Sequence, residues 1–493
     1  MVKYHSTRDN TNIKTASEAI LQGLAEDGGL FVPDQIPPLP CTIEDMVSMS
    51  YQDIAKEILG AFLGDFTKEE IAYCVDHAYD EKFRDESIVP LSYADGAYYM
   101  ELYHGRTMAF KDMALSILPY LMKVSAKKHG IKSDIVILTA TSGDTGKAAL
   151  SGFSDVEGTK IVVFYPKDGV SPIQKAQMVT EQGKNTLVVG IDGNFDDAQT
   201  AVKEIMSDPT VKDELKKHGF RLSSANSINI GRLIPQIVYY VNAYVSLVQF
   251  ERIENGDEVN VCVPTGNFGN ILAAFYAKLM GLPIGKLIVA SNENRVLTDF
   301  FETGKYDANR EFHLTNSPSM DILVSSNLER LIFHATSGSI VQTKSLMEEL
   351  SERKKYELPF LLMDNIDDFE AFSATEEETL KKIGDLYKKS GYLIDTHTAV
   401  AAVCLDKYRE SNDERPCLVA STASPFKFPK AISAAISYKG DGLSDIELVE
   451  KMAVDLKLPI PEAIEELKKL PARHKKTCKR DEMLSVVYEF LGI

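Results

Sequence analysis

Residues 104–112 read His-Gly-Arg-Thr-Met-Ala-Phe-Lys-Asp, and they join a predicted strand to a predicted helix in this chain of 493 residues. Apolar and aromatic residues indicate the strand over 98–102, and an amphipathic pattern indicates the helix over 113–122. Lys111 therefore lies at a strand-to-helix turn, among mostly apolar neighbours. A lysine amine that is desolvated in such a turn loses its proton readily and can form a Schiff base with a carbonyl group. An isolated lysine is more often a surface residue, so this interpretation depends on other motifs.

Two further loops, each between an apolar run and a helical pattern, provide sites for anions. Residues 139–146 read Thr-Ala-Thr-Ser-Gly-Asp-Thr-Gly, and residues 265–270 read Thr-Gly-Asn-Phe-Gly-Asn. In such loops the backbone N–H groups at the start of the helix favour a bound anion, and glycines let the ligand approach the backbone closely. Either loop alone could serve only the fold, because glycine-rich turns are common in proteins.

Together the three motifs predict an enzyme that binds pyridoxal 5'-phosphate. They combine a lysine suited to a Schiff base, a cradle for a phosphate ester and a separate loop for a substrate anion, which are the groups that this cofactor requires. An alternative is a binding module that holds a nucleotide or a sugar phosphate without covalent chemistry. The position of Lys111 disfavours this alternative.

The order of the predicted elements indicates parallel sheets. Short apolar runs at 161–164, 187–190, 259–263 and 287–290 are each followed by a helical pattern. Strands that alternate with helices in this way form right-handed βαβ units, so we expect an α/β fold with open, mostly parallel sheets.

Composition argues against several other classes of protein. The net charge of −18 argues against non-specific binding to nucleic acid, so an anionic substrate must be attracted by local positive groups. No apolar run reaches the length of a membrane span and the first residues lack the apolar core of a signal peptide, so we expect a cytoplasmic protein without a membrane partner. The six cysteines are scattered without a Cys-x-x-Cys pair, so neither a metal site nor a disulfide framework is expected.

The motifs resemble those of the threonine synthase family. Residues 104–112 resemble the family signature H-G-P-T-x-A-F-K-D, and residues 142–146 match its S-G-D-T-G loop. Further matches lie at 23–31, 226–229 and 421–428, so the resemblance runs almost from end to end of the chain.

The resemblance implies an architecture that periodicity alone does not supply. Threonine synthases belong to the tryptophan-synthase-β-like enzymes, or fold type II, in which the cofactor lies between a large and a small open-sheet domain. We therefore expect a mainly helical N-terminal domain over 1–95, a large cofactor-binding domain over 96–129 and 216–493, and a small domain over 130–215 that carries the substrate-anion loop.

The resemblance also assigns the cofactor-binding residues. Lys111 would form the Schiff base and then move protons at Cα and Cβ of the substrate. The hydroxyl of Thr422 would bond the pyridine nitrogen, with Ser421 and Ser424 as nearby rivals. The cofactor phosphate would be held by the loop of Gly266, Asn267, Phe268, Gly269 and Asn270.

The implied activity is that of a lyase in threonine biosynthesis, which converts O-phosphohomoserine and water to threonine and phosphate by γ-elimination and β-hydration. The loop of Ser142, Gly143, Asp144 and Thr145 would bind the substrate carboxylate. Because the Asp144 carboxylate would repel that group, we expect it to orient the N–H groups of the loop. For the substrate phosphate we expect Arg232, which lies three residues after Asn229 and so on the same helix face, with Asn229 also at the substrate.

Several positions depart from the family pattern. Arg106 stands where the family usually has Pro, Thr396 replaces the Pro of its D-P-H-T run, and Ser424 replaces a common His. Arg106 and Lys427 are alternative cations for the substrate phosphate. A dehydratase or phospholyase of the same fold, acting on a related amino acid, remains the alternative function. We expect a monomer or small homo-oligomer that acts on a small molecule.

Overall fold

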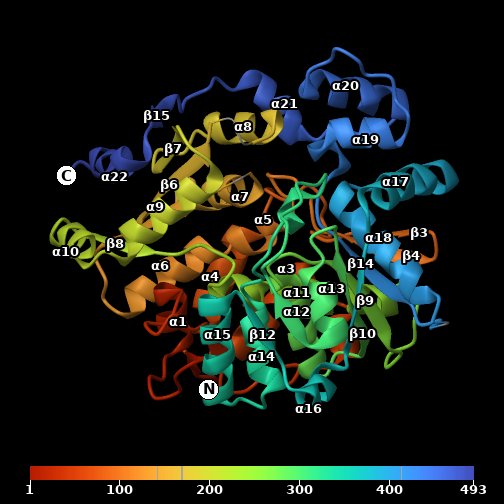
Figure 1. Cartoon of the computed structure of the whole chain (residues 1–493), viewed down its shortest axis with the longest axis horizontal. Helices are drawn as coiled ribbons and strands as arrows, with labels where there is room; N and C mark the ends of the chain where they lie inside the picture. The colour runs from red at the N-terminus through yellow and green to blue at the C-terminus, as the bar shows by residue number, and fades with distance from the viewer. Residues whose placement is uncertain (142, 168–169, 412) are drawn as a thin grey trace.

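Two mostly parallel sheets, each covered by helices, form the framework of the chain in a computed structural model (Figure 1). The structure describes residues 1–141, 143–167, 170–411 and 413–493. Within these ranges, none of the helices is both long and apolar enough to cross a membrane.

The larger sheet has six strands in the order β13-β10-β9-β14-β4-β3. All neighbours are parallel except β3 and β4, which form an antiparallel edge. Every residue of β9 and of β14 is buried, as expected for central strands that helices cover on both faces. The strands are β3 (Leu91–Ala94), β4 (Ala97–Glu101), β9 (Val259–Pro264), β10 (Ile284–Ser291), β13 (Phe369–Ser373) and β14 (Cys417–Ser421).

The two faces of this sheet belong to different hydrophobic cores. Val261 and Val263 of β9 join the core formed with α3 (Tyr51–Phe62), α11 (Ile230–Gln249) and α12 (Gly269–Leu279). Cys262, which points to the other face, joins the core formed with α17 (Glu376–Ser390), α18 (Thr396–Arg409), α19 (Pro429–Ala435) and α20 (Asp445–Leu456). This alternation follows from the two-residue period of a strand.

The smaller sheet has five parallel strands in the order β15-β7-β6-β5-β8. Three of them lie within 130–215, whereas β8 follows that interval and β15 comes from near the end of the chain. Strand β15 has only three residues, Lys-Thr-Cys, and so carries no apolar run that would predict it. The strands are β5 (Asp134–Ala140), β6 (Thr159–Pro166), β7 (Thr186–Ile191), β8 (Phe220–Ser223) and β15 (Lys476–Cys478).

Helices cover this sheet on both sides. One face of the sheet forms a hydrophobic core with α9 (Phe195–Ser207), α10 (Pro209–Lys217) and the C-terminal α22 (Met483–Leu491). The remaining helices of this part are α7 (Asp144–Phe153) and α8 (Pro172–Val179). Figure 1 shows the blue C-terminal segment running along the upper edge of the view, from α19 and α20 through α21 (Glu462–Lys469) to β15 and α22.

The N-terminal part is mainly helical, as predicted, and its core is continuous with that of α11 and α12. Four of its helices begin with a Ser or Thr that forms a reciprocal capping box. Its elements are β1 (Tyr4–Ser6), α1 (Ala16–Gln22), β2 (Phe31–Pro33), α2 (Ile43–Met46), α3 and α4 (Lys68–Ala78).

Short elements complete the chain. Two helices follow β4, and several short pieces surround the larger sheet. They are α5 (Lys111–Leu115), α6 (Leu118–Lys128), α13 (Val296–Thr303), β11 (Lys305–Asp307), η1 (Pro318–Met320), α14 (Leu328–Ala335), α15 (Ile340–Arg353), β12 (Lys355–Glu357), α16 (Phe360–Met363), η2 (Asp364–Ile366), η3 (Pro425–Lys427) and η4 (Arg480–Glu482).

One fully buried arginine joins three distant parts of this framework. Arg330 of α14 donates from Nε to the carbonyl of Phe31 at 2.9 Å and from a terminal nitrogen to the carbonyl of Ile228 at 2.6 Å. It also donates to the side chain of Asn327, whose own amide donates to the carbonyl of Asn267 at 2.9 Å. Arg330 therefore links the N-terminal part, the start of α11 and the predicted phosphate loop.

We expect Arg330→Met to lower the free energy of unfolding by about 3 kcal/mol, because three buried acceptors lose a charged donor. Arg295→Met, at an exposed ion pair with Asp299, should cost less than about 1 kcal/mol. Denaturant titration of both variants measures the difference. Equal losses would contradict the central role of Arg330.

Candidate active site

Three predicted site loops follow three adjacent strands of the larger sheet. Lys111 follows β4, the loop 265–270 follows β9, and Thr422 follows β14, and these strands are neighbours in the order β9-β14-β4. Since the strands are parallel, their carboxyl ends lie at one edge of the sheet, where ligands bind in open α/β folds. The structure therefore brings these predicted residues together.

Lys111 is the first residue of a helix. The helix predicted over 113–122 is in fact two helices, because α5 begins at Lys111 and is interrupted before α6, which has a proline in its first turn. A proline there supplies no N–H to continue the preceding helix. Thr107 shapes the turn before Lys111 by donating its N–H and its hydroxyl to Asp112, at 2.7 and 2.6 Å.

Backbone hydrogen bonds join the Lys111 turn to the loop of Thr422. The N–H of Phe110 donates to the carbonyl of Thr422 at 2.8 Å, and the N–H of Ser424 donates to the carbonyl of Met108 at 3.1 Å. These bonds hold the lysine turn and the Thr422 loop in register.

The Lys111 amine lies in a buried setting. Its Nζ is 3.3 Å from the hydroxyl oxygen of Ser319 and 3.9 Å from a carboxylate oxygen of Asp144. Burial lowers the pKa of Lys111 to about 8, and the nearby Lys427 and Arg232 act in the same direction, whereas the Asp144 carboxylate opposes them. An amine with this pKa is partly neutral near neutral pH and can act as a nucleophile or a base.

The loop after β9 has the form of a phosphate cradle. Phe268 adopts a left-handed conformation, with φ of 63°, and no side chain caps the first N–H groups of α12. A Cβ atom on Gly266 would lie 2.7 Å from the carbonyl oxygen of Ser319, so only glycine fits there. The buried amide nitrogen of Asn270 lacks a hydrogen-bond partner among the described residues. The Phe268 ring packs in the core, so this residue would contribute its backbone.

These features fit pyridoxal 5'-phosphate. Lys111 can hold its aldehyde carbon, and the uncapped start of α12 with the N–H groups of the loop 266–270 can hold its phosphate. Asn267 is exposed at the edge of this loop, and its carbonyl is engaged by Asn327. Gly269 lies at the first position of α12 and is partly exposed.

Of the three hydroxyls considered for the pyridine nitrogen, that of Thr422 is the least engaged by other groups in the described structure. The Ser421 hydroxyl lies 3.2 Å from that of Thr398, and the Ser424 hydroxyl caps η3 by accepting the N–H of Phe426. In the part of the chain that the structure describes, no side-chain hydrogen bond engages the hydroxyl of Thr422. It therefore remains available to a ligand.

The substrate-anion loop is organised differently from the prediction. Ser142 lies outside the described residues. Thr141, and not Asp144, orients the loop, because its hydroxyl accepts the N–H groups of Gly143 and Gly146, both at 3.0 Å. Gly143 has φ of 155° and packs under Gln174. Thr145 is the second residue of α7, and no described side chain caps the N-terminus of this helix.

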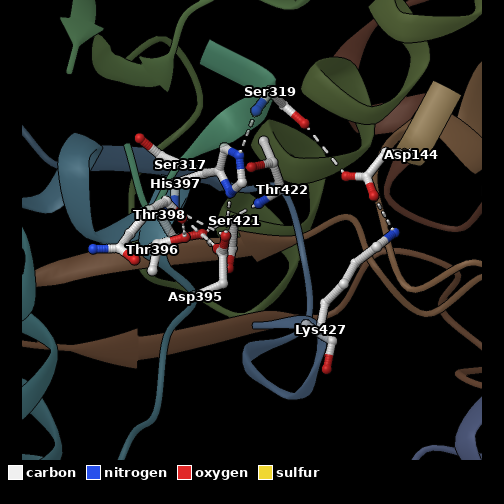
Figure 2. A network of polar contacts seen from close by, with 12 residues as sticks. Asp144, Ser317, Ser319, Asp395, Thr396, His397, Thr398, Ser421, Thr422 and Lys427 are labelled. Atoms are coloured by element: carbon white, nitrogen blue, oxygen red, sulfur yellow. Dashed lines mark hydrogen bonds and ion pairs between the residues drawn. The ribbon is translucent and has the colours of Figure 1, made fainter. Parts of the chain in front are cut away.

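Asp144 instead bridges the smaller sheet to the larger one. Its carboxylate oxygens lie 2.9 Å from Lys427 Nζ and 3.3 Å from the Ser319 hydroxyl (Figure 2). One of them also accepts from Gln174 at 2.7 Å. Burial raises the pKa of Asp144, but the lysine ammonium groups outweigh it and hold that pKa well below its usual range. Asp144 is therefore ionised, and it closes α7 onto the Lys111 site.

Arg232 is a buried cation that lacks an acidic partner in the described structure. It is 4 % exposed, one terminal nitrogen donates to the carbonyl of Ala225 at 3.1 Å, and its Nε has no partner among the described residues. Burial lowers its pKa to about 10, so it stays charged. An unpaired buried guanidinium near Lys111 is suited to an anionic ligand.

Asn229 has a structural role that the prediction did not foresee. Its side chain caps α11 by accepting the N–H of Gly231, and its amide donates to the carbonyls of Ile20 and Ser224, at 3.0 and 2.9 Å. It is fully buried, so these contacts do not support the predicted contact with substrate. Asn229 holds the helix that carries Arg232.

The two alternative cations lie in different places. Lys427 is fully buried and donates to the carbonyl of Thr107 at 2.7 Å, in addition to its pair with Asp144. Arg106 is exposed and lines a cavity of about 390 Å³ together with Tyr103 and Tyr392. Lys111 and the loop 266–270 do not line this cavity.

Several residues of the site were not singled out from the sequence. Ser319 reaches Lys111 from 208 positions away, and His397 accepts the N–H of Ser319 (Figure 2). The sequence signal for His397 is the run Asp-Thr-His-Thr at 395–398, which differs from the family pattern at Thr396. The others are Thr107, Thr141, Gln174, Asp395 and Thr398.

Family profiles cover nearly the whole chain. Residues 3–79 match "Threonine synthase N terminus", residues 91–421 match "Pyridoxal-phosphate dependent enzyme", and residues 398–487 match "Threonine synthase, C-terminal". They confirm the resemblance, fold type II and the cofactor, pyridoxal 5'-phosphate.

Individual proteins agree with the profiles. The chain is 37% identical to the threonine synthase of Schizosaccharomyces pombe, over 89% of this chain and 90% of that one. It is 42% identical to threonine synthase-like 1 of Macaca fascicularis over 86% of this chain, but spans only 58% of that relative's length. The structure of pyridoxal-phosphate-bound threonine synthase from Brucella melitensis matches with a TM-score of 0.88 and 34% identity, over 100% of this chain and 99% of that one. This chain therefore belongs to the threonine synthase family of pyridoxal-phosphate-dependent enzymes.

Proposed function

We propose that this enzyme converts O-phosphohomoserine and water to threonine and phosphate. The observation that carries the proposal is Arg232, a buried guanidinium without an acidic partner in the described structure, close enough to Lys111 to lower its pKa. A substrate with a phosphate group would supply the missing negative charge at the reacting amine.

Lys111 would move the protons in this reaction. When bound, pyridoxal 5'-phosphate withdraws electrons from the substrate carbons and so makes their protons acidic. The Lys111 amine, with a pKa of about 8, can accept a proton at Cα or Cβ and return it at nearly the same pH. Thr422 would bond the ring nitrogen, and the loop 266–270 would fix the phosphate of the cofactor.

Arg232 would bind the substrate phosphate and would stay in contact with it while it leaves. A guanidinium binds a phosphate through two parallel N–H bonds, and so it can follow the group as it departs from Cγ. Lys427 is already paired with Asp144, which makes it the weaker candidate for the same phosphate. The start of α7 at Gly143, Asp144 and Thr145 would receive the substrate carboxylate.

The alternative is a dehydratase or phospholyase of the same fold. The similarity to threonine synthase-like 1, and the replacement of family residues at Arg106, Thr396 and Ser424, keep this alternative open. It shares Lys111 and the cofactor loop but adds no water at Cβ. Under either function, we propose that the protein is cytoplasmic and is a monomer or a small homo-oligomer.

Incubation of the purified holoenzyme with O-phosphohomoserine should release threonine and phosphate in equal amounts. Lys111→Ala should lower the rate by more than about 10³-fold, because no neighbour can take its covalent role. Amino-acid analysis and a phosphate assay measure both products in one sample. Release of phosphate with 2-oxobutyrate in place of threonine would favour the alternative function.

Arg232→Ala should reduce turnover of O-phosphohomoserine by about 10²- to 10³-fold while binding of an unphosphorylated amino acid changes little. The reason is that the guanidinium is needed only where a phosphate must be held. The control is binding of homoserine, followed by the change in cofactor absorbance. An equal loss for both ligands would show that Arg232 supports the fold or the carboxylate instead.

A further inference from the structure

The segment that carries Ser319 lies between the phosphate loop and Lys111. The Ser319 hydroxyl is 3.3 Å from Lys111 Nζ and 3.3 Å from an oxygen of Asp144, so it can accept from the amine and donate to the carboxylate. The carbonyl of the same residue packs against Gly266. Ser319 therefore contacts both the lysine and the cradle that the cofactor would occupy.

A histidine of α18 holds the backbone of this segment. The N–H of Ser319 donates to His397 Nε2 at 3.1 Å, and His397 Nδ1 lies 2.8 Å from a carboxylate oxygen of Asp395 (Figure 2). Because a backbone N–H can only donate, Nε2 must be the acceptor and the proton must be on Nδ1. The ring is thus neutral and has a defined tautomer.

The carboxylate that holds the histidine is itself fixed. Asp395 is fully buried and caps α18 by accepting the N–H groups of His397 and Thr398, at 2.9 and 3.1 Å. It also accepts the hydroxyl of Thr398, which lies 3.2 Å from the Ser421 hydroxyl beside Thr422. A rigid helix terminus therefore sets the position of the ring, and through the ring that of Ser319.

A second hydrogen bond from α18 holds the same segment three residues before Ser319. The Thr396 hydroxyl donates to the carbonyl of Asn316 at 2.6 Å. A proline, which the family usually has at this position, could not form that bond. This bond does not reach Ser319, so it offers a control for the contact of His397.

We propose that His397 is a positioning residue that acts through Ser319 to orient the Lys111 amine for its reaction with the cofactor aldehyde. The proposal rests on the proposed covalent role of Lys111 and goes beyond it by naming what orients the amine. Four charged groups also act on Lys111. Asp144 and Asp112 favour its protonated form, and Lys427 and Arg232 disfavour it. None of the four is bonded to His397 in the described structure, so its substitution tests orientation separately from charge.

Capture of added pyridoxal 5'-phosphate by the full-length apoenzyme tests the proposal. Capture joins Lys111 Nζ to the aldehyde carbon and releases the aldehyde oxygen as water, and the visible absorbance follows it. Pyridoxine 5'-phosphate has a hydroxymethyl group in place of the aldehyde, so its affinity, measured by calorimetry, reports on the phosphate cradle alone.

We expect Ser319→Ala to slow capture about tenfold, because the amine loses the partner that orients it. The affinity for pyridoxine 5'-phosphate should change by less than about twofold, since the backbone at Gly266 is unchanged. His397→Leu should slow capture similarly. His397→Gln should restore most of the rate, because its amide oxygen can still accept the N–H of Ser319. Thr396→Pro should leave capture within about twofold, because proline is tolerated in the first turn of a helix.

An unchanged rate of capture in Ser319→Ala would overturn the proposal, and so would a His397→Gln variant as slow as His397→Leu. Should His397→Leu fail to fold, an unchanged rate of capture in Ser319→Ala still overturns the proposal. If the unsubstituted apoenzyme neither captures pyridoxal 5'-phosphate nor binds pyridoxine 5'-phosphate, the assignment of the cradle is wrong, and the positioning role is overturned with it.

Discussion

Burial of three cations near the Asp144 carboxylate is the constraint on which this site depends. Lys427 and Arg232 are buried and Lys111 is largely buried, with 11 % of its side chain exposed, and Asp144 is the acidic group that contacts the two lysines in the described structure. A buried charge is costly unless it is paired, so the site is stable only with help from its surroundings. An anionic cofactor and substrate would pair with these cations. Burial lowers the pKa of Lys111, and two of these same cations, Lys427 and Arg232, lower it further.

The framework holds these charges in place from several directions. Three adjacent parallel strands bring the lysine turn, the phosphate loop and the Thr422 loop to one edge of the larger sheet. Asn229 and Arg330 fix the start of α11, and thereby Arg232, through bonds to the N-terminal part. Asp144 comes from the smaller sheet, so the site is complete only when the two sheets are closed on each other.

Local sequence patterns predicted those features of the site whose residues are close together in the sequence. The Lys111 turn, the loop 265–270 and the parallel sheets were all visible, because each joins an apolar run to a helical pattern. Contacts between distant segments were not visible, since they depend on packing and not on spacing. Ser319 meets Lys111 across 208 positions, and β15 joins β7 from the far end of the chain. The pairing of Asp144 with Lys427 was not predicted for the same reason, because Lys427 lies on another loop.

The pH dependence of Lys111 reactivity in the full-length apoenzyme tests the central claim most directly. Peptide mass spectrometry measures the rate at which an amine-reactive reagent modifies Lys111. This rate should rise with pH through a midpoint of about 8, because only the neutral amine reacts. The exposed Lys381, whose pKa is raised by Asp385, serves as the internal control and should react with a midpoint above that of an ordinary lysine. A midpoint for Lys111 at or above about 10.4, the ordinary value, would contradict the account.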